Sequence, residues 1–210
     1  YLRTLVGAIE AVRTGTTTIC DDFNVSPQIR RDHIDAAFQA YEDVGIRALV
    51  GITLFDRPFF RAVPYVDEEF PPDLLAELDG TRMYGPEELL AVVTELARTR
   101  HPQHNRVGYI LAPSAPQRCT EDFLKSVRRI ADDYDLPLMT HVHGVWMNPR
   151  DIRMIADSGV SVQHNPTSNL KVGSGLLPLR ALLDQGVNVS LGSDGCGSIE
   201  NVDMLLVLAT

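Results

Sequence analysis

The feature that most constrains the fold of this chain is a regular alternation of short apolar segments with amphipathic helices. Apolar side chains recur at helical spacing up to a glycine, a β-branched segment follows, and a polar loop leads to the next helix. The segments predicted to be strands are 16–20, 48–54, 107–112, 136–142, 160–162 and 187–191. This alternation predicts parallel strands joined by right-handed helical crossovers.

Two architectures are built from such units, the doubly wound sheet and the (β/α)8 barrel. A doubly wound sheet usually carries a glycine-rich phosphate loop after its first strand, and this chain has none there. The predicted fold is therefore α/β, a (β/α)8 barrel that lacks some of its units. Because the chain starts at Tyr1 and stops within the apolar stretch 204–208, we expect it to be a piece of a longer protein. The connection 56–84 exceeds normal loop length, which favours a functional role for it.

The composition of the chain argues against several classes of protein. The 210 residues are enough for one core, so a single domain over 1–210 is expected. The 19 basic and 28 acidic residues give a net charge of −9, which argues against a nucleic-acid surface. No apolar run is long enough to span a membrane. Cys20, Cys119 and Cys196 are odd in number and far apart, which is typical of reduced thiols in a cytoplasmic protein.

Polar side chains follow the predicted strands at their C-terminal ends, where a (β/α)8 barrel carries its chemistry. They are Asp21 and Asp22, Ser114 and Gln117, His141 and His143, His164 and Asn165, and Ser193 and Asp194. Imidazole and carboxylate groups are good ligands of Zn²⁺ or Fe²⁺, and such an ion lowers the pKa of a bound water. Their convergence predicts a metal-dependent hydrolase.

Several of these residues also have a structural interpretation. A single histidine at a strand end is more often a hydrogen-bonded structural residue, and Asp21 and Asp22 are equally suited to cap a helix. His101 and His104 have the spacing of a ligand pair but lie in a polar loop. Trp146 is expected to pack against other side chains and not to bind substrate. No histidine neighbours a cysteine in the sequence, which disfavours a cysteine nucleophile.

Three stretches are specific enough to indicate a family. Residues 13–18 are RTGTTT, residues 163–175 are QHNPTSNLKVGSG, and residues 186–195 are GVNVSLGSDG. Together they resemble the amidohydrolase superfamily, in the branch of the cytosine, guanine, adenosylhomocysteine and s-triazine aminohydrolases and chlorohydrolases. The resemblance covers nearly the whole chain in order, and residues 112–119, APSAPQRC, are similar to that branch's loop after the fourth barrel strand.

The resemblance implies a distorted (β/α)8 TIM barrel with one divalent metal ion, Zn²⁺ before Fe²⁺. A water activated by this ion would displace ammonia, an amine or chloride from a ring carbon of a nitrogen heterocycle. By the same resemblance, Asp194 matches the residue that binds the metal and accepts the water's proton. His141 matches a metal-binding histidine after the fifth strand, and His143 matches the non-ligand catalytic histidine after the sixth.

The expected partner is a small heterocyclic substrate, with neither nucleic acid nor membrane, and a homo-oligomer is compatible with the sequence. Substrate contacts are expected from Ser114, Gln117, Asp22 and Asn165. Two alternatives remain open at this point, a hydrolase of cyclic amides and a catalytically inactive barrel that binds a ligand.

The chain departs from the family pattern at three places. The His-x-His pair of the first strand does not precede Tyr1, and Gly144 stands where the family has a proton-shuttling Glu. The motifs of the fifth and sixth strands, normally tens of residues apart, abut at Val142 and His143. A true loss of a strand would expose sheet edges. We therefore expect a chain break at 142/143, with the Glu and the sixth strand in the missing segment, and further barrel parts missing at both ends.

Overall fold

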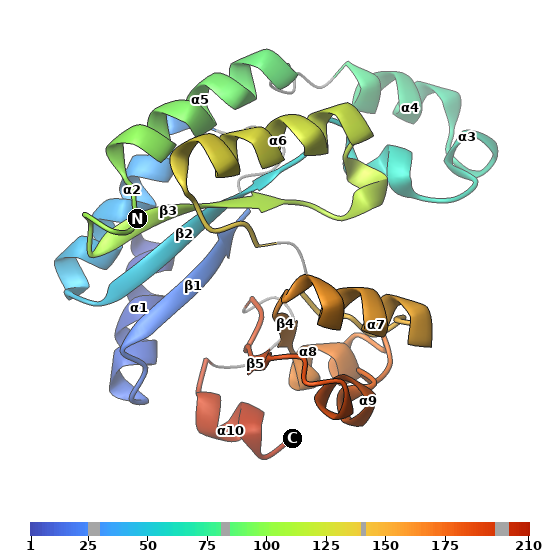
Figure 1. Ribbon diagram of the computed structural model, residues 1–210. Coiled ribbons are helices and arrows are strands. Elements are labelled where there is room, and N and C mark those ends of the chain that lie inside the picture. Colours follow the sequence, from blue (N-terminus) through green and yellow to red (C-terminus); the bar gives the residue numbers. More distant parts are fainter. Residues whose placement is uncertain (25–29, 81–84, 140–141, 196–201) are drawn as a thin grey trace. The chain divides into compact units, whose positions relative to one another are not determined.

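A computed structural model describes residues 1–24, 30–80, 85–139, 142–195 and 202–210 (Figure 1). The chain divides into two compact units. The first consists of Tyr1–Leu5 and Thr18–Thr140, and the second of Val6–Thr17 and His141–Thr210. Helix α1 (Leu2–Arg13) contributes to both units.

The first unit is built on a parallel sheet whose strands follow the order β1, β2, β3 (Figure 1). Its strands are β1 (Thr18–Phe23), β2 (Arg47–Leu54) and β3 (Val107–Pro113). Three long helices pack against it: α2 (Arg31–Val44), α5 (Pro86–Thr99) and α6 (Glu121–Tyr134). Every residue of β3 is buried, as expected for a strand inside a parallel α/β layer.

Local sequence explains where these helices begin and end. Ile34, Phe38 and Tyr41 recur on one face of α2 and are buried, and Gly45 ends that helix in the left-handed region with φ 83°. The Thr120 hydroxyl accepts a hydrogen bond from the backbone N–H of Phe123 and so caps α6. The end of α2 and the start of α6 thus follow from these residues.

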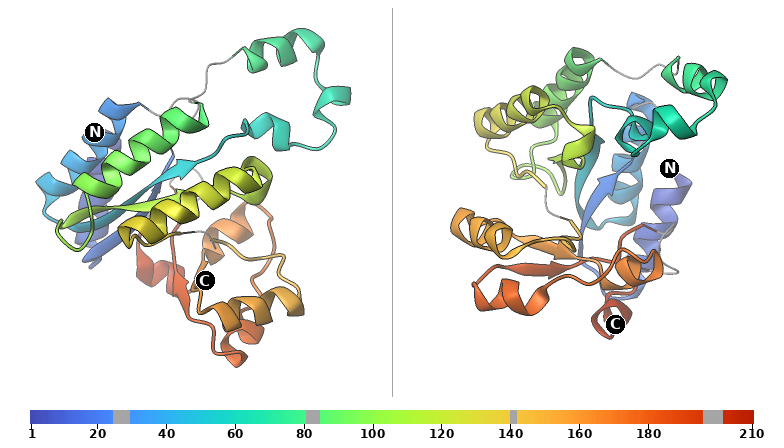
Figure 2. Two further views of the ribbon diagram at one scale, coloured as in Figure 1. Left: turned by 45° about the horizontal axis from the view of Figure 1, so that its top comes forward. Right: turned by 90° about the vertical axis from the view of Figure 1, so that its right-hand side faces the viewer.

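The connection after β2 is not a plain loop. It contains the short helices η1 (Phe59–Ala62), α3 (Val66–Glu69) and α4 (Pro72–Asp79), which extend beyond the end of the sheet (Figure 2). Arg61 joins them, since its guanidinium forms ion pairs with Asp67 and with Asp79. A short helical stretch η2 (Pro116–Arg118) follows β3.

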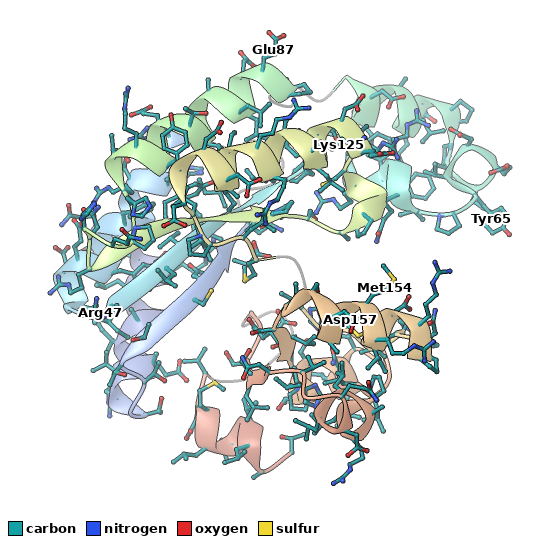
Figure 3. The ribbon with its side chains drawn as sticks, in the orientation of Figure 1. Arg47, Tyr65, Glu87, Lys125, Met154 and Asp157 are labelled. Atoms are coloured by element: carbon teal, nitrogen blue, oxygen red, sulfur yellow. The ribbon has the colours of Figure 1, made fainter. Side chains whose placement is uncertain are left out.

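The second unit contains a two-stranded parallel sheet of β4 (Val162–His164) and β5 (Val189–Leu191). Its helices are α7 (Pro149–Ser158), α8 (Pro166–Lys171), α9 (Leu179–Asp184) and α10 (Met204–Leu208). The core of this unit consists of Ile152, Ile155, Val162, Leu177, Leu182 and Val187. Helix α7 turns Ile152 and Ile155 into that core and Met154 and Asp157 outward to solvent (Figure 3).

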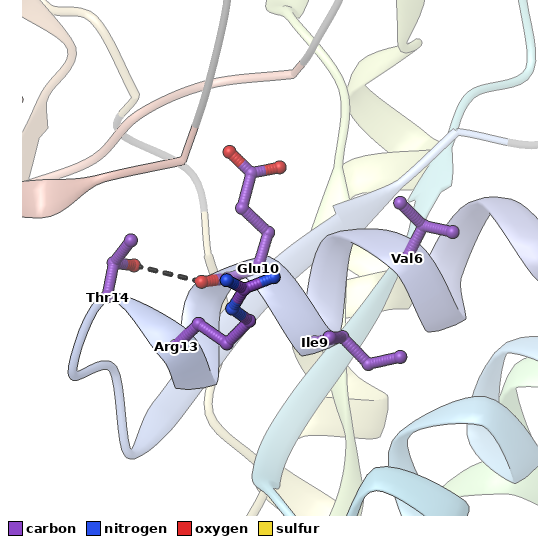
Figure 4. A pocket seen from close by; sticks show the side chains of 5 residues that line it. All are labelled: Val6, Ile9, Glu10, Arg13 and Thr14. Atoms are coloured by element: carbon purple, nitrogen blue, oxygen red, sulfur yellow. Dashed lines mark hydrogen bonds between the residues drawn. The ribbon is translucent and has the colours of Figure 1, made fainter.

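A hollow runs along α1 within the second unit. It is lined by Val6, Ile9, Glu10, Arg13 and Thr14, and the Thr14 hydroxyl donates to the Glu10 carbonyl oxygen at 3.1 Å (Figure 4). None of these residues is a candidate catalytic group. Among the described residues, no helix has both the length and the apolar character needed to cross a bilayer.

The α/β class with parallel strands is confirmed, and some local predictions are wrong. The predicted strand 136–142 is reduced to two isolated parallel bridges, Leu111 to Leu138 and Val142 to Gln163, with residues 140–141 outside the described part. Helix α8 was not predicted, because its six residues are too few for a periodic signal. Trp146 does not pack in a core, since 88 % of it is exposed.

Candidate active site

Four polar side chains of the second unit form one connected group: His143, Ser168, Asn169 and Asp194. His143 follows the bridge residue Val142, Ser168 and Asn169 are consecutive on α8, and Asp194 lies three residues after β5. Because Val142 bridges to β4 and β4 pairs with β5 in parallel, the chain brings His143 and Asp194 to the same end of this sheet. The sequence predicted that these two residues would meet at strand ends.

The contacts within the group are direct. Asn169 Oδ1 lies 2.7 Å from His143 Nδ1, and the Ser168 hydroxyl donates to Asp194 Oδ2 at 2.5 Å. The backbone N–H of Gly195 donates to the other carboxylate oxygen, Oδ1, at 2.6 Å. His143 Nε2 and Asp194 Oδ2 are 3.7 Å apart, so the two groups face each other beyond hydrogen-bond distance.

Both central residues have unusual backbone conformations. His143 has φ 72° and Asp194 has φ 66°, in the left-handed region that residues other than glycine seldom adopt. The backbone N–H of His143 donates to the Gln163 carbonyl oxygen at 2.9 Å, which helps to hold the first of these conformations. Such strain collects at functional sites, where the surrounding structure must hold a side chain in one place.

Ser168 and Asn169 were quoted in the motif but were not predicted as site residues. Both are 1 % exposed, and the proline at the first position of α8 presets the helical backbone before them. The backbone N–H of Asn169 donates to the Asn165 carbonyl oxygen at 3.0 Å. The sequence did contain a signal for these two residues. They are adjacent hydrogen-bonding side chains within residues 163–175, the stretch most specific to the family.

Asn165 was predicted to contact substrate. In the structure it is buried, and its Oδ1 accepts a hydrogen bond of 3.1 Å from the Gln163 side-chain amide. This amide pair covers Gly192, where an added Cβ would come within 2.1 Å of Gln163 Nε2 and 2.2 Å of Asn165 Oδ1. A side chain at position 192, two residues before Asp194, would therefore have to displace this amide pair. The amide pair thus packs directly against the chain segment that carries the carboxylate.

His164 is a buried histidine on the last position of β4. Its Nδ1 has no hydrogen-bond partner within the described part of the chain, and burial lowers its pKa from the usual 6.5. The resemblance did not imply a ligand role for it, and its position inside the unit agrees with a structural role.

Acidification is expected to destabilise the protein through His164. Its pKa is lower in the folded state, so the unfolded chain binds the proton first as the pH falls through about 6.5. Stability is then lost until the folded pKa is reached. Urea unfolding at a series of pH values should show this decline in wild type and a flatter profile in His164→Gln. Equal slopes in the two proteins would contradict the assignment.

The other predicted substrate residues belong to the first unit. Asp21 and Asp22 do not follow β1 as predicted but are its fourth and fifth residues, and neither caps a helix. Asp22 accepts a hydrogen bond of 2.7 Å from the Thr53 hydroxyl. Asp21 accepts one of 2.8 Å from Tyr41, and burial raises the pKa of that aspartate.

After β3, Ser114 is half-buried and its hydroxyl accepts a hydrogen bond of 3.3 Å from Arg118, whereas Gln117 is exposed on η2. The Arg118 guanidinium stacks on the Phe55 ring at 3.9 Å from its centroid. Sequence reasoning did not single out Arg118. The residues Asp22, Ser114 and Gln117 lie near the C-terminal ends of β1 and β3, and their contact with substrate stays a prediction.

The described residues do not complete a metal site. His141, the predicted histidine ligand, lies outside the described residues, and no three His, Cys, Asp or Glu side chains converge within the described part. Asp194 and His143 supply one carboxylate and one imidazole. These are ligand types that zinc accepts, but a protein zinc site has at least three such ligands.

Two further groups have structural roles. His101, from the loop pair with His104, places its Nε2 2.9 Å from the Tyr134 carbonyl oxygen. The Cys119 thiol is buried, and this burial raises its pKa to about 11, so it is a poor nucleophile. Both outcomes agree with the structural interpretation of these residues, and Cys196 lies outside the described part.

With this geometry established, comparison with known proteins places the chain. The model of the amidohydrolase family matches residues 1–144 and, separately, residues 142–210. The chain belongs to the amidohydrolase family. This amidohydrolase is 30 % identical to a 5-methylthioadenosine/S-adenosylhomocysteine deaminase of Thermococcus kodakarensis, over 95 % of the chain and 48 % of that relative.

Solved structures of two enzymes are similar in fold to this chain. An adenosine deaminase from Xanthomonas campestris with bound zinc is 25 % identical, with a TM-score of 0.76 over 97 % of this chain and 47 % of the other. The zinc complex of an atrazine chlorohydrolase from Arthrobacter aurescens TC1 is 21 % identical, with a TM-score of 0.78 over 95 % of this chain and 49 % of the other. The amidohydrolase chain thus spans about half the length of the relatives it matches.

Proposed function

We propose that this chain is part of a metal-dependent hydrolase that displaces ammonia, an amine or chloride from a nitrogen heterocycle. The observation that carries the proposal is the approach of His143 and Asp194 to 3.7 Å at the same end of the second unit's sheet in an amidohydrolase. The names of the relatives favour a purine nucleoside, because the Thermococcus kodakarensis and Xanthomonas campestris proteins are deaminases of adenosine-type compounds.

Asp194 is the proton acceptor in this proposal. Its carboxylate is held at both oxygens, by the Ser168 hydroxyl and by the Gly195 N–H, so it meets the attacking water in a fixed orientation. A carboxylate that accepts the water's proton during attack can return it to the leaving nitrogen. His143 faces the same space with its Nε2 and orients the reacting groups there.

The metal ion of this proposal requires ligands besides those in the described residues. Asp194 would be one ligand and His141 a second, and the remaining histidines would come from parts of the protein outside this chain. An ion of this kind lowers the pKa of water, so that a nucleophile is available near neutral pH. Zinc is favoured because the adenosine deaminase structure of Xanthomonas campestris holds it.

We further infer that the two parallel sheets are parts of one distorted (β/α)8 barrel from which a segment between Val142 and His143 is missing. The family model matches the chain in two pieces that meet at 142–144. The alignment with the Thermococcus kodakarensis deaminase extends over 235 residues, more than the 210 of this chain, so that relative has additional residues within the aligned region. The two-piece match supports an absent segment at this junction, and the longer alignment is what such an absence would produce.

The cysteines favour a cytoplasmic enzyme. Cys20 and Cys119 are free thiols, one exposed and one buried, and the described part of the chain contains no disulfide. Free thiols persist in a reducing compartment.

Activity and metal content of the complete protein test the proposal together. We expect release of ammonia from adenosine, 5′-deoxyadenosine or guanine, or of chloride from a chloro-s-triazine. We expect this activity to be lost on chelation and restored by Zn²⁺. A protein that binds zinc but turns over none of these compounds would favour the inactive ligand-binding barrel. Activity that survives complete removal of metal would contradict the proposal.

A further inference from the structure

We propose that Asn169 is a positioning residue, which holds the proton of neutral His143 on Nδ1 and turns the Nε2 lone pair toward Asp194. The proposal rests on the proposed function, because it assigns His143 the role of a hydrogen-bond acceptor in that reaction. It concerns a residue of α8 that makes no contact with Asp194 among the described interactions.

Asn169 is a rigid anchor for the His143 ring. Asn169 is 1 % exposed and fixed by backbone hydrogen bonds on both sides, from its N–H to Asn165 and from Ser174 to its carbonyl oxygen. The His143 side chain is 43 % exposed, so packing alone leaves its ring free to rotate. The contact of 2.7 Å between Asn169 Oδ1 and His143 Nδ1 therefore anchors an exposed ring to a buried, rigid group.

The contact with Asn169 also determines which ring nitrogen of His143 carries the proton. A neutral imidazole has one N–H and one lone pair, and a carbonyl oxygen such as Asn169 Oδ1 only accepts hydrogen bonds. The N–H must then be on Nδ1, since the hydrogen bond at one ring nitrogen determines which nitrogen carries the proton. Nε2 is left with its lone pair on the side of Asp194.

The position of this proton has a consequence for the site. Nε2 of His143 and Oδ2 of Asp194 are then two acceptors that face one space from 3.7 Å apart. Two acceptors repel each other until a group with hydrogens lies between or beside them. The attacking water and the departing ammonia or amine both carry such hydrogens. Asn169 thus makes the site selective for a hydrogen-bond donor at the reacting position.

The ring nitrogens of His143 report directly on this arrangement. We would record long-range ¹H–¹⁵N spectra of the complete protein labelled with ¹⁵N-histidine, well above the ordinary pKa of histidine, and assign His143 by its loss in His143→Gln. The wild type should show a protonated Nδ1 and an unprotonated Nε2. A wild-type spectrum with the proton on Nε2 would mean that the Asn169 amide has the opposite orientation, and it would overturn the proposal.

Three variants separate positioning from general damage. Asn169→Leu, of similar shape but without an acceptor, should lose the Nδ1 proton signal and reduce kcat about 10–100-fold with little change in KM. Asn169→Asp keeps an acceptor and should keep Nδ1 protonated. Ser168→Ala is the matched control, because Ser168 is the neighbouring residue on α8, equally buried, and contacts Asp194 instead of His143. It should leave the His143 spectrum unchanged.

These measurements show separately whether the positioning role of Asn169 fails and whether the proposed function fails. An active wild type in which Asn169→Leu keeps both the spectrum and kcat would overturn the inference and leave the function intact. A wild type that turns over no heterocycle, but whose Nδ1 signal disappears in Asn169→Leu, would refute the function and support the positioning role. If Asn169→Leu does not fold, as judged by circular dichroism, the wild-type and Asn169→Asp spectra decide the question.

Discussion

Replacement of Asp194 by asparagine should lower turnover in the complete protein by about 10²–10⁴-fold, the usual loss when a general base is removed. Asparagine keeps the shape of aspartate and can still accept hydrogen bonds from Ser168 and Gly195, but it cannot take a proton from water. Substrate binding should change far less. Single-turnover kinetics on an accepted heterocycle, with substrate affinity measured separately, would show this division.

The matched control is Asp157→Asn, because Asp157 is exposed on the outer side of α7 (Figure 3). This variant should have the turnover of wild type. Metal content must be measured in each protein, since a loss of metal would lower activity for another reason. Turnover close to wild type in metal-loaded Asp194→Asn would rule out Asp194 as the proton acceptor.

Truncation of Leu182 should destabilise the second unit by about 2–5 kcal/mol, the range observed for deletion of a large buried aliphatic side chain. Leu182 is 0 % exposed and lies in the core with Ile152, Ile155 and Val187. The next residue of α9, Leu183, is 51 % exposed, so Leu183→Ala should cost less than about 0.5 kcal/mol. The free energy of unfolding in urea provides the comparison. Equal losses in the two variants would show that this face of α9 is not the buried one.

The sequence predicted the parts of the fold that depend on local patterns. Helix α2 follows from the spacing of its buried apolar residues, and α6 and α7 begin at the capping residues Thr120 and Asn148. The strand predicted at 136–142 failed because an apolar run becomes a strand only where neighbours pair along its length. The short helices after β2 were missed because four to eight residues are too few to show a helical period.

Only part of the candidate site could be predicted from the sequence. Asp194 and His143 were found because a carboxylate and an imidazole at strand ends carry a chemical signal of their own. Ser168 and Asn169 contact Asp194 and His143, and such contacts depend on distances that a sequence does not state. The contact of Asn165 with substrate stays a prediction, and its burial beside the Gln163 amide depends on neighbours that a sequence does not place. His141 remains a prediction.

The short helix α8 places a limit on how this protein can vary in length. Ser168 and Asn169 are neighbours on a helix of six residues, and one reaches Asp194 while the other reaches His143. An insertion or deletion of one residue after Pro166 would rotate both side chains by about 100° around the helix axis. Both contacts would then be lost in a single event, although no residue of the pair itself had been replaced. This segment should therefore tolerate many substitutions on its exposed side but no change in the number of its residues.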